Sequence, residues 1–585
     1  MEKKLTQNAY AGRISRIGLR LLTTLLLLSI IIPSQLYAQS FKVSGTVKDA
    51  KGNPIAGVSV VIKGTRLGST TNQEGHFSIE APAQTSTLVF TNVGYTTWEE
   101  EIAGRSKIIV TLTDKTSDMS DVIVIGYGTQ RKRDITGAIS SVSAKQISER
   151  QAVTVADALQ GQVPGLQIAV GSGAPGASNI SSNQSLLIRG IGTLQTGAGP
   201  LIVVDGAQGV DLNSINPNDI QSVEVLKDAA SASIYGSKSA NGVILITTKR
   251  GSDGKPLLGV NYISSWSSLS HKIPQTNAAG RKLYDFKRTG NYSTSTDSLN
   301  PSTNADNDYQ DMLTRTGRRD EVDLSVSSGT KNLNFYSGLS YLNEQGIIIN
   351  SWSKTVRGRL NVDYKQDRFS FGTRVVGSYN FSNFISEGNT LAQAIQRPPN
   401  FAMIFPDGTL APVIGGRKNP VAYALLYKNR YDIINASMYN YVAYAITPDL
   451  KLTVDANVSI NPIHNLQFTP TLLEGNTNSG KDSNVVNNYW ITQAYLNFSK
   501  TLRGKHTIIG LLGTSAEENY MKKTGLSGSN FVSEQVTSIS TAQVLGLPVN
   551  VESKSTQASV FGRVGYSYMG RYIINGNLRA DASSN

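Results

Sequence analysis

Residues 215–251, INPNDIQSVEVLKDAASASIYGSKSANGVILITTKRG, contain two runs of Val, Ile and Leu that flank an Ala/Ser-rich segment ending at Tyr235-Gly236. Ahead of the first run, Asn216 is a residue type that caps helical turns, Pro217 stands at the first helical position, and Asp219 follows in the first turn. β-Branched runs bounded by Gly and Asn favour strands. The stretch therefore predicts a capped turn followed by two strands that are joined by a further turn.

Short strand-forming runs and helical segments also occur in the residues that precede this stretch. VADALQGQVPGLQIAV, residues 155–170, has apolar side chains at helical spacing, a break at a Pro-Gly pair and then a strand-forming run. LLIRGIGT (186–193) and PLIVVDG (200–206) supply two more short apolar runs. Strands interleaved with short helical segments indicate a mixed α/β unit that extends to Gly251.

These residues resemble a known family. DVIVIGYGTQRKRDITGAISSV (121–142), LQGQVPGLQI, LIRGIG, PLIVVDG and the stretch 215–251 are similar to the plug domain of TonB-dependent outer-membrane transporters, and more narrowly to the SusC/RagA class. The resemblance is dense over residues 120–251. It implies a plug domain at 136–251, preceded at 116–135 by a linker that carries the TonB box.

The segment before the plug joins a strand-forming run to a block of three positive charges at 131–133, with Gly126 and Gly128 between them. The resemblance places the TonB box in this run, and the candidate residues are Asp121, Val122, Ile123, Val124, Ile125, Gly126 and Tyr127. Such a box adds a strand to the sheet edge of its periplasmic partner. Gly128 and the basic block are expected to keep the following residues out of the plug. The alternative is that 121–127 is an ordinary first plug strand.

A small all-β region precedes the linker. Residues 41–112 hold short alternating strands punctuated by Gly, Pro and Asn, which is typical of a sandwich. GTVKDAKGNPIAGVSVVIKGT (45–65), TTNQEGHFSI and VGYTTWEEEI resemble the carboxypeptidase-regulatory-like domain, a prealbumin-type β-sandwich. We assign it residues 39–115. The resemblance implies an accessory fold and no peptidase activity.

Residues 252–585 alternate apolar and polar side chains over many strands. Val356, Leu360 and Val362 alternate with Arg357, Arg359 and Asn361, and similar patterns begin at Trp490 and Tyr572. Strands of 9–11 residues with one apolar face and one polar face are typical of outer-membrane β-barrels, and the 25 Tyr residues suit interfacial girdles. A soluble sandwich would also alternate, but its inner face would not be lined with Arg, Asn and Asp.

The pattern yields roughly 11 such strands, against about 22 in outer-membrane transporters with a plugged lumen. We therefore expect 252–585 to form the first part of a transmembrane antiparallel barrel, as in a truncated transporter. The expected fold class is mainly β: a prealbumin-like β-sandwich, an α/β plug and a partial barrel.

The N-terminus predicts export. Five basic residues precede an apolar core at 21–32, and Pro33 and the small residue Ala38 follow before Gln39. This pattern indicates a signal peptide over 1–38 that is cleaved between Ala38 and Gln39. An uncleaved anchor is the alternative. With export, the expected location is the outer membrane.

Other chemistries find little support. The chain has no Cys and four scattered His, which excludes thiolate chemistry and shows no zinc motif. GSGAPG (171–176) formally matches a nucleotide-binding pattern, but no helix pattern follows, so we expect a flexible plug loop exposed toward substrate or lid. Asp205 is expected to be structural. The net charge of +13 is spread thinly, which argues against nucleic-acid binding. We expect no enzyme activity and no cofactor.

The resemblance implies energy-coupled import of a nutrient, an oligosaccharide or a peptide, across the outer membrane. The implied partners are TonB in the periplasm, a SusD-like surface lipoprotein acting as a lid, and outer-membrane lipid. Alternatives are a siderophore or vitamin receptor of the same fold, a sensor that signals to an anti-sigma factor, and the non-functional product of a truncated gene. We rank the sensor low because the sandwich begins close to Gln39.

Overall fold

The structure is a computed structural model that describes residues 41–49, 52–65, 67–92, 95–113, 122–125, 128–131, 138–180, 184–192, 199–228, 232–251, 254–290, 301–413 and 416–584; for 122–125, 128–131 and 184 it describes the backbone alone. The chain divides into two compact units, 1–121 and 122–585. The predicted cleavage site at Ala38 and Gln39 lies outside the described residues, as do Asp121, Gly126 and Tyr127.

The first unit is a β-sandwich of two sheets. The sheets have the strand orders β4-β1-β7 and β3-β2-β5-β6. Their bounds are β1 (Phe41–Asp49), β2 (Ser59–Ile62), β3 (Gly68–Thr70), β4 (His76–Ala81), β5 (Thr87–Thr91), β6 (Trp98–Glu101) and β7 (Lys107–Leu112). Both sheets contribute to one core, in which the Phe77 and Phe90 rings meet edge to face at 5.3 Å. The predicted sandwich is confirmed.

The second unit begins with a short hairpin. β8 (Val122–Ile125) pairs antiparallel with β9 (Gly128–Arg131), so that Val122 lies opposite Arg131. The strand predicted for the TonB-box candidate is therefore present at its described positions. Gly128 begins the second strand, and pairing with β8 satisfies the backbone groups of both segments. This two-stranded sheet is separate from the sheet of the plug.

The plug holds a five-stranded sheet of order β10-β15-β16-β13-β14 and the separate hairpin β11-β12. Its strands are β10 (Ile139–Ser143), β11 (Leu166–Val170), β12 (Gln184–Ile188), β13 (Leu201–Val204), β14 (Ala207–Gln208), β15 (Ile220–Leu226) and β16 (Val243–Thr248). Its helical segments are α2 (Ala144–Ser148), α3 (Val155–Leu159), η2 (Ala177–Asn179), η3 (Leu212–Ser214), η4 (Pro217–Asp219) and η5 (Ser233–Ser239).

The stretch 215–251 folds as predicted. The Asn216 side chain caps a 3₁₀ turn by accepting from the backbone N–H of Asn218 at 2.9 Å, and Pro217 opens that turn. β15 and β16 then pair antiparallel on either side of the Ala/Ser-rich segment. Their Val, Ile and Leu side chains form the centre of the plug core.

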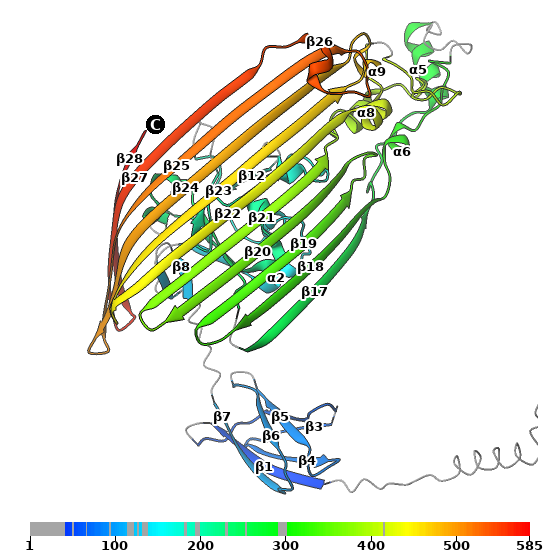
Figure 1. Cartoon of the computed structure of the whole chain (residues 1–585). Helices are drawn as coiled ribbons and strands as arrows, with labels where there is room; N and C mark the ends of the chain where they lie inside the picture. The colour runs from blue at the N-terminus through cyan, green and yellow to red at the C-terminus, as the bar shows by residue number, and fades with distance from the viewer. Residues whose placement is uncertain are drawn as a thin grey trace, which may run out of the picture. The chain divides into compact units, whose positions relative to one another are not determined.

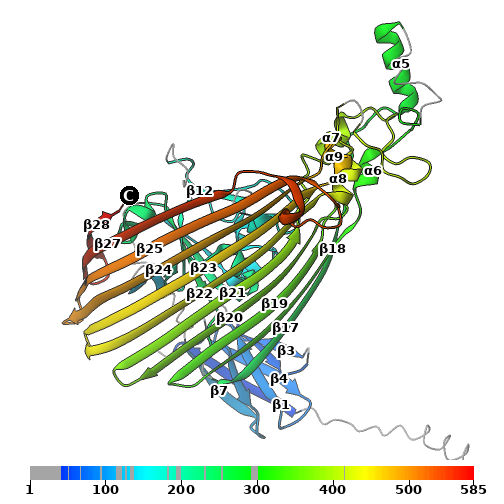
Figure 2. The ribbon, with the colours of Figure 1, turned by 45° about the horizontal axis from the view of Figure 1, so that its top comes forward.

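A 12-stranded antiparallel sheet forms a curved wall around the plug (Figures 1 and 2). Its path runs from β17 through β25 to β27 and β28, and β26 pairs with β25 at the side. The bounds are β17 (Gly254–Ser267), β18 (Gly317–Gly329), β19 (Leu333–Gln345), β20 (Trp352–Gln366), β21 (Phe369–Asn383), β22 (Lys428–Thr447), β23 (Leu450–Thr469), β24 (Ser479–Leu502), β25 (His506–Phe531), β26 (Ala542–Leu545), β27 (Val549–Tyr568) and β28 (Tyr572–Ser583).

The predicted alternation of apolar and polar side chains along the wall strands is confirmed. Val356 and Leu360 are 41% and 39% exposed on the outer face, whereas Arg357 and Arg359 are 4% and 6% exposed on the face that meets the plug. The strands are longer than predicted, with 24 residues in β24 and 26 in β25. About 10 residues suffice to cross a bilayer, so the remaining residues of these strands extend the paired sheet beyond it.

Short helices gather at one end of the wall (Figure 2). They are α5 (Ala278–Thr289), α6 (Tyr309–Leu313), α7 (Leu391–Gln396), α8 (Pro420–Leu426), α9 (Thr471–Glu474) and η7 (Ile539–Thr541). α6 to α9 share a small apolar core around Tyr309, Met403 and Leu473. Within the described residues, no helix combines the length and the apolar character needed to cross a membrane.

Candidate functional site

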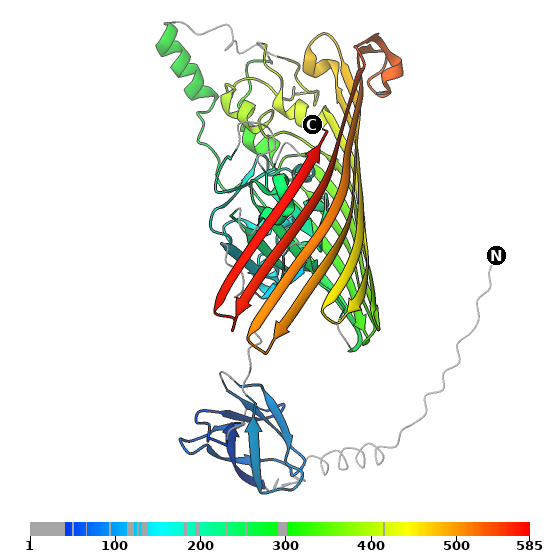
Figure 3. The same cartoon turned by 90° about the vertical axis from the view of Figure 1, so that its left-hand side faces the viewer.

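The plug lies against the concave face of the wall (Figure 3), and a buried ion pair joins them. Asp205, which follows β13, pairs with Arg359 of β20, and both side chains are almost fully buried. The Asp205 carboxylate also accepts from the Thr248 backbone N–H at 3.0 Å. Burial alone would raise the pKa of Asp205, but the charges of Arg359 and Arg250 and the bonds from Thr248 outweigh it and hold that pKa below its usual value. The expected structural role of Asp205 is confirmed.

Neighbouring wall residues hold the plug backbone directly. Arg357 donates to the carbonyls of Asn213 at 3.1 Å and Val153 at 3.3 Å. Asn361 donates to the Lys249 carbonyl at 2.9 Å. These hydrogen bonds satisfy plug carbonyls that would otherwise be buried against the wall without a partner.

The capped turn η4 is attached in the same way. Asn216 and Asn218 donate to the two oxygens of Asp323 on β18 at 2.6 and 2.9 Å. Asp219 accepts from the Tyr336 hydroxyl at 2.5 Å. Burial raises the pKa of Asp219 and outweighs the Tyr336 hydrogen bond and the charges of Arg359 and Lys249, which lower that pKa.

The GSGAPG loop is not free. Ser172 donates to Glu387 at 2.8 Å, and a Cβ on Gly176 would lie 2.9 Å from the Ser353 Oγ of β20. Gly176 has a φ of +73°, which favours glycine. Gly171 and Gly173 are exposed as expected, whereas Pro175 and Gly176 are buried, and Gly176 packs against the wall. A three-residue 3₁₀ turn, η2, follows it, and so short a turn supplies no phosphate-binding helix.

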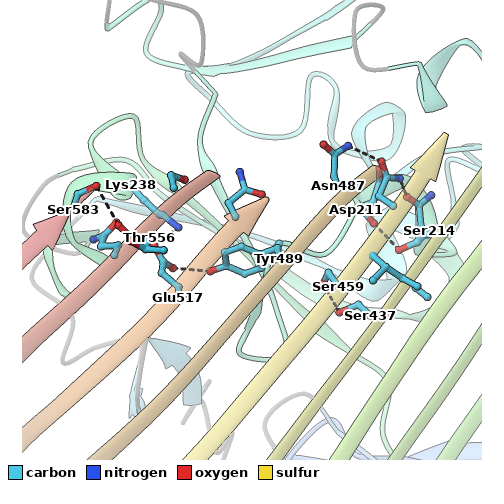
Figure 4. A pocket seen from close by; sticks show the side chains of 18 residues that line it. Asp211, Ser214, Lys238, Ser437, Ser459, Asn487, Tyr489, Glu517, Thr556 and Ser583 are labelled. Carbon is cyan, nitrogen blue, oxygen red and sulfur yellow. Dashed lines mark hydrogen bonds and ion pairs between the residues drawn. The ribbon is translucent and has the colours of Figure 1, made fainter. Parts of the chain in front are cut away.

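A polar cavity of about 350 Å³ lies between the plug and strands β22 to β25, β27 and β28 (Figure 4). The plug contributes the turn around Gly209, Asp211 and Ser214, and η5 contributes Lys238. The wall contributes mostly amide and hydroxyl side chains. They are Asn435, Ser437, Ser459, Asn461, Asn487, Tyr489, Asn519, Ser555, Thr556, Gln557 and Ser583, together with Glu517.

One border of the cavity is charged. The Lys238 Nζ lies 2.5 Å from an oxygen of Glu517, and the Tyr489 hydroxyl donates to the other oxygen at 2.7 Å. The same Nζ lies 5.1 Å from the centre of the Tyr489 ring. Gly209 packs on this ring so closely that a Cβ would lie 2.3 Å from Cδ1. Tyr489 therefore joins the plug to the wall at the edge of the cavity.

None of the cavity residues stands out in the sequence by itself. The alternating pattern places Asn435, Asn461 and Asn487 on the inner faces of three strands, but only the register shows that they are neighbours. Asn461 lies opposite Asn487. The sequence signal that could have indicated this cavity is an inward-facing Asn at a matching position on each of three consecutive strands.

The described residues hold no group of three or more His, Asp or Glu that could bind a metal ion. The four His, at 76, 271, 464 and 506, belong to different parts of the chain.

Comparisons with known proteins agree with this architecture. Residues 131–243 match the TonB-dependent Receptor Plug Domain model, and residues 43–124 match the CarboxypepD_reg-like domain model. TonB-dependent receptor P39 of Formosa agariphila is 34% identical over 96% of this chain and 54% of its own length. TonB-dependent receptor SusC of Bacteroides thetaiotaomicron is 26% identical over 96% of this chain and 58% of its own length. This chain thus spans about half the length of the curated relatives it matches.

Among solved structures, the RagAB peptide importer in the open-open state superposes with a TM-score of 0.69. It is 22% identical and covers 79% of this chain and 56% of its own chain, so this likeness concerns the fold. The sandwich, the plug and the long antiparallel sheet together define a TonB-dependent receptor of the outer membrane. Within that group, the chain is similar to SusC and has the fold of the RagAB importer.

Proposed function

We propose that this protein imports a nutrient, an oligosaccharide or a peptide, across the outer membrane in a TonB-dependent manner. The observation that carries the proposal is a plug fixed inside a polar-lined wall by buried contacts such as Asp205–Arg359, with a polar cavity beside it. A plug in this position blocks passage until something moves it. The likeness to SusC and to RagAB supports a SusD-like surface lipoprotein as the partner that covers the cavity.

The same proposal assigns the TonB box to Asp121, Val122, Ile123, Val124, Ile125, Gly126 and Tyr127. The described part, Val122–Ile125, is a strand that already pairs with β9 on one edge. Its other edge is the one we propose for strand addition to TonB. We propose domain bounds of 39–115 for the sandwich, 116–135 for the linker, 136–251 for the plug and 252–585 for the wall.

Replacing Ile123 with Pro tests the coupling. Proline removes a backbone donor and disfavours strand addition, so we expect uptake to be lost while the amount of protein at the cell surface is unchanged. Ile123→Thr is the matched control, because threonine is β-branched and keeps the donor. Uptake by Ile123→Pro at the wild-type rate would place the TonB box elsewhere.

A further inference from the structure

The cavity wall holds a ladder of three asparagines on adjacent strands. The Asn487 Nδ2 donates to the Asn461 Oδ1 at 3.2 Å, and Asn461 in turn donates to the Asn435 Oδ1. Asn435 continues the row by donating to the Ser378 Oγ at 3.1 Å. We call Asn435, Asn461 and Asn487 the amide ladder. Its members all line the cavity.

The ladder has a definite chemical character. A carboxamide offers two donors and two acceptor lone pairs, and each step of the ladder uses one donor and one acceptor position. Asn461 also donates to the Ile434 carbonyl at 3.4 Å, so it keeps acceptor capacity, whereas Asn435 and Asn487 keep capacity of both kinds beside the cavity. A hydroxyl group is likewise both donor and acceptor, so it can bond to a rung without a charge on either side. Hydroxyl side chains beside the ladder, among them Ser437 and Ser459, which bond to each other at 2.9 Å, extend this neutral surface.

The charged residues of the cavity do not favour an ionic ligand. Lys238 and Glu517 are paired with each other at 2.5 Å. Asp211 accepts from the backbone N–H of Asn213 at 2.7 Å as the cap of its own turn. A ligand carboxylate would meet two acidic side chains and could reach the Lys238 ammonium only by separating it from Glu517. Leaving that partly buried carboxylate unpaired would be unfavourable.

We propose that the amide ladder is the specificity-determining surface of the cavity and that it binds an uncharged, hydroxyl-rich ligand, that is, a neutral saccharide segment. This inference rests on the proposed import function and selects between its two substrate classes. The ladder distinguishes saccharides from peptides because its amides hydrogen-bond to hydroxyl groups. It offers no charged group to pair with a charged peptide terminus. The Lys238–Glu517 pair forms the border of the same surface.

Asn461 is the rung to change, because it is bonded on both sides. Asn461→Leu keeps the side-chain size and removes every polar atom of the central rung. The matched control is Asn465→Leu. Asn465 lies on the same strand and the same face, and makes a similar amide bond to the Asn429 Oδ1 at 3.0 Å, but it does not line the cavity. Thermal unfolding of both variants measures the general effect of losing one amide rung.

Binding is measured by titration calorimetry on the purified full chain in detergent, without TonB. The probes are uncharged hexasaccharides of glucose, mannose, xylose or fructose, and octapeptides with free termini. We expect at least one hexasaccharide to bind, Asn461→Leu to weaken it at least tenfold, which corresponds to about 1.4 kcal/mol, and Asn465→Leu to leave its Kd within twofold. Failure of every saccharide to bind, or equal Kd values for Asn461→Leu and wild type, overturns the proposal.

The two proposals fail in different experiments. Uptake that is independent of Ile123 contradicts TonB-coupled import through the assigned box and leaves saccharide binding to the ladder intact. Ile123-dependent uptake combined with octapeptide binding that Asn461→Leu abolishes retains the import function and overturns the ligand class.

Discussion

At the scale of single residues, two plug aspartates occupy opposite electrostatic environments. Asp205 is paired with Arg359, and the surrounding positive charge lowers its pKa despite burial. Asp219 is buried beside the Tyr336 hydroxyl with less compensation, and its pKa is raised. The first carboxylate therefore stabilises the plug in its charged form, and the second opposes folding when it is charged.

Neutralising each aspartate should separate these effects. Asp205→Asn leaves Arg359 buried without its counter-charge, and we expect a loss of about 3–5 kcal/mol. Asp219→Asn keeps an oxygen that can accept from Tyr336, and we expect no loss or a small gain at pH 7. Hydrogen exchange of β16 amides measures plug stability in both variants. A larger loss for Asp219→Asn than for Asp205→Asn would contradict the pair of assignments.

The pH dependence follows from the same directions. Because the folded-state pKa of Asp205 is depressed, its contribution is present above the unfolded pKa, about 3.9, and is lost as the pH falls through the lower folded value. Because the pKa of Asp219 is raised, its protonation adds stability as the pH falls from the folded value toward about 3.9. β16 protection in Asp219→Asn should therefore lack the gain that wild type shows on mild acidification. An identical profile in both proteins would contradict this.

At the scale of elements, the sequence predicts those features that depend on local pattern. The cap at Asn216, the strands β15 and β16, and the alternation around Arg357 all follow from spacing and residue type. The helices α6 to α9 at the end of the wall cannot be predicted in this way, because they are short and are stabilised by a shared core drawn from separate loops. The cavity also escapes prediction, since neighbours such as Asn461 and Asn487 meet only through strand register.

The plug turn at Gly209 provides a test at this scale. Gly209 and Gly161 share a φ of +74°, but only Gly209 packs against a ring, whereas a Cβ at Gly161 would meet nothing within 4 Å. Gly161→Ala should show the backbone effect alone, about 1–2 kcal/mol. Gly209→Ala should lose a further 1–3 kcal/mol or so through overpacking and displace Tyr489. Equal losses in thermal or denaturant unfolding would show that the Tyr489 contact is not tight.

At the scale of the whole molecule, the chain consists of two compact units. The sandwich has its own core of Val, Ile, Leu and Phe side chains, whereas the plug core includes wall residues such as Val376 and Tyr439. The sandwich should therefore fold without the rest of the protein, and the plug should not.

A fragment of residues 39–115 tests this independence. A domain of this size can hold a small core, so we expect cooperative urea unfolding and resistance to protease. Phe77→Ala should lose about 3–5 kcal/mol because it opens a cavity in that core. Ile109→Ala is the control, since Ile109 is 67% exposed, and should change stability by less than about 0.5 kcal/mol. A fragment without a cooperative transition would contradict the separation.

The long sequence distance between the plug and its last contacts has a consequence for the order of events during biogenesis. Ser233 of the plug accepts a hydrogen bond from Asn577, 344 residues further along the chain. Lys238 of the plug forms its ion pair with Glu517, which is also far along the chain. Contacts of such separation form late, because the intervening loop must first be closed. We therefore expect the plug to reach its final packing only when β25 and β28 have folded against it.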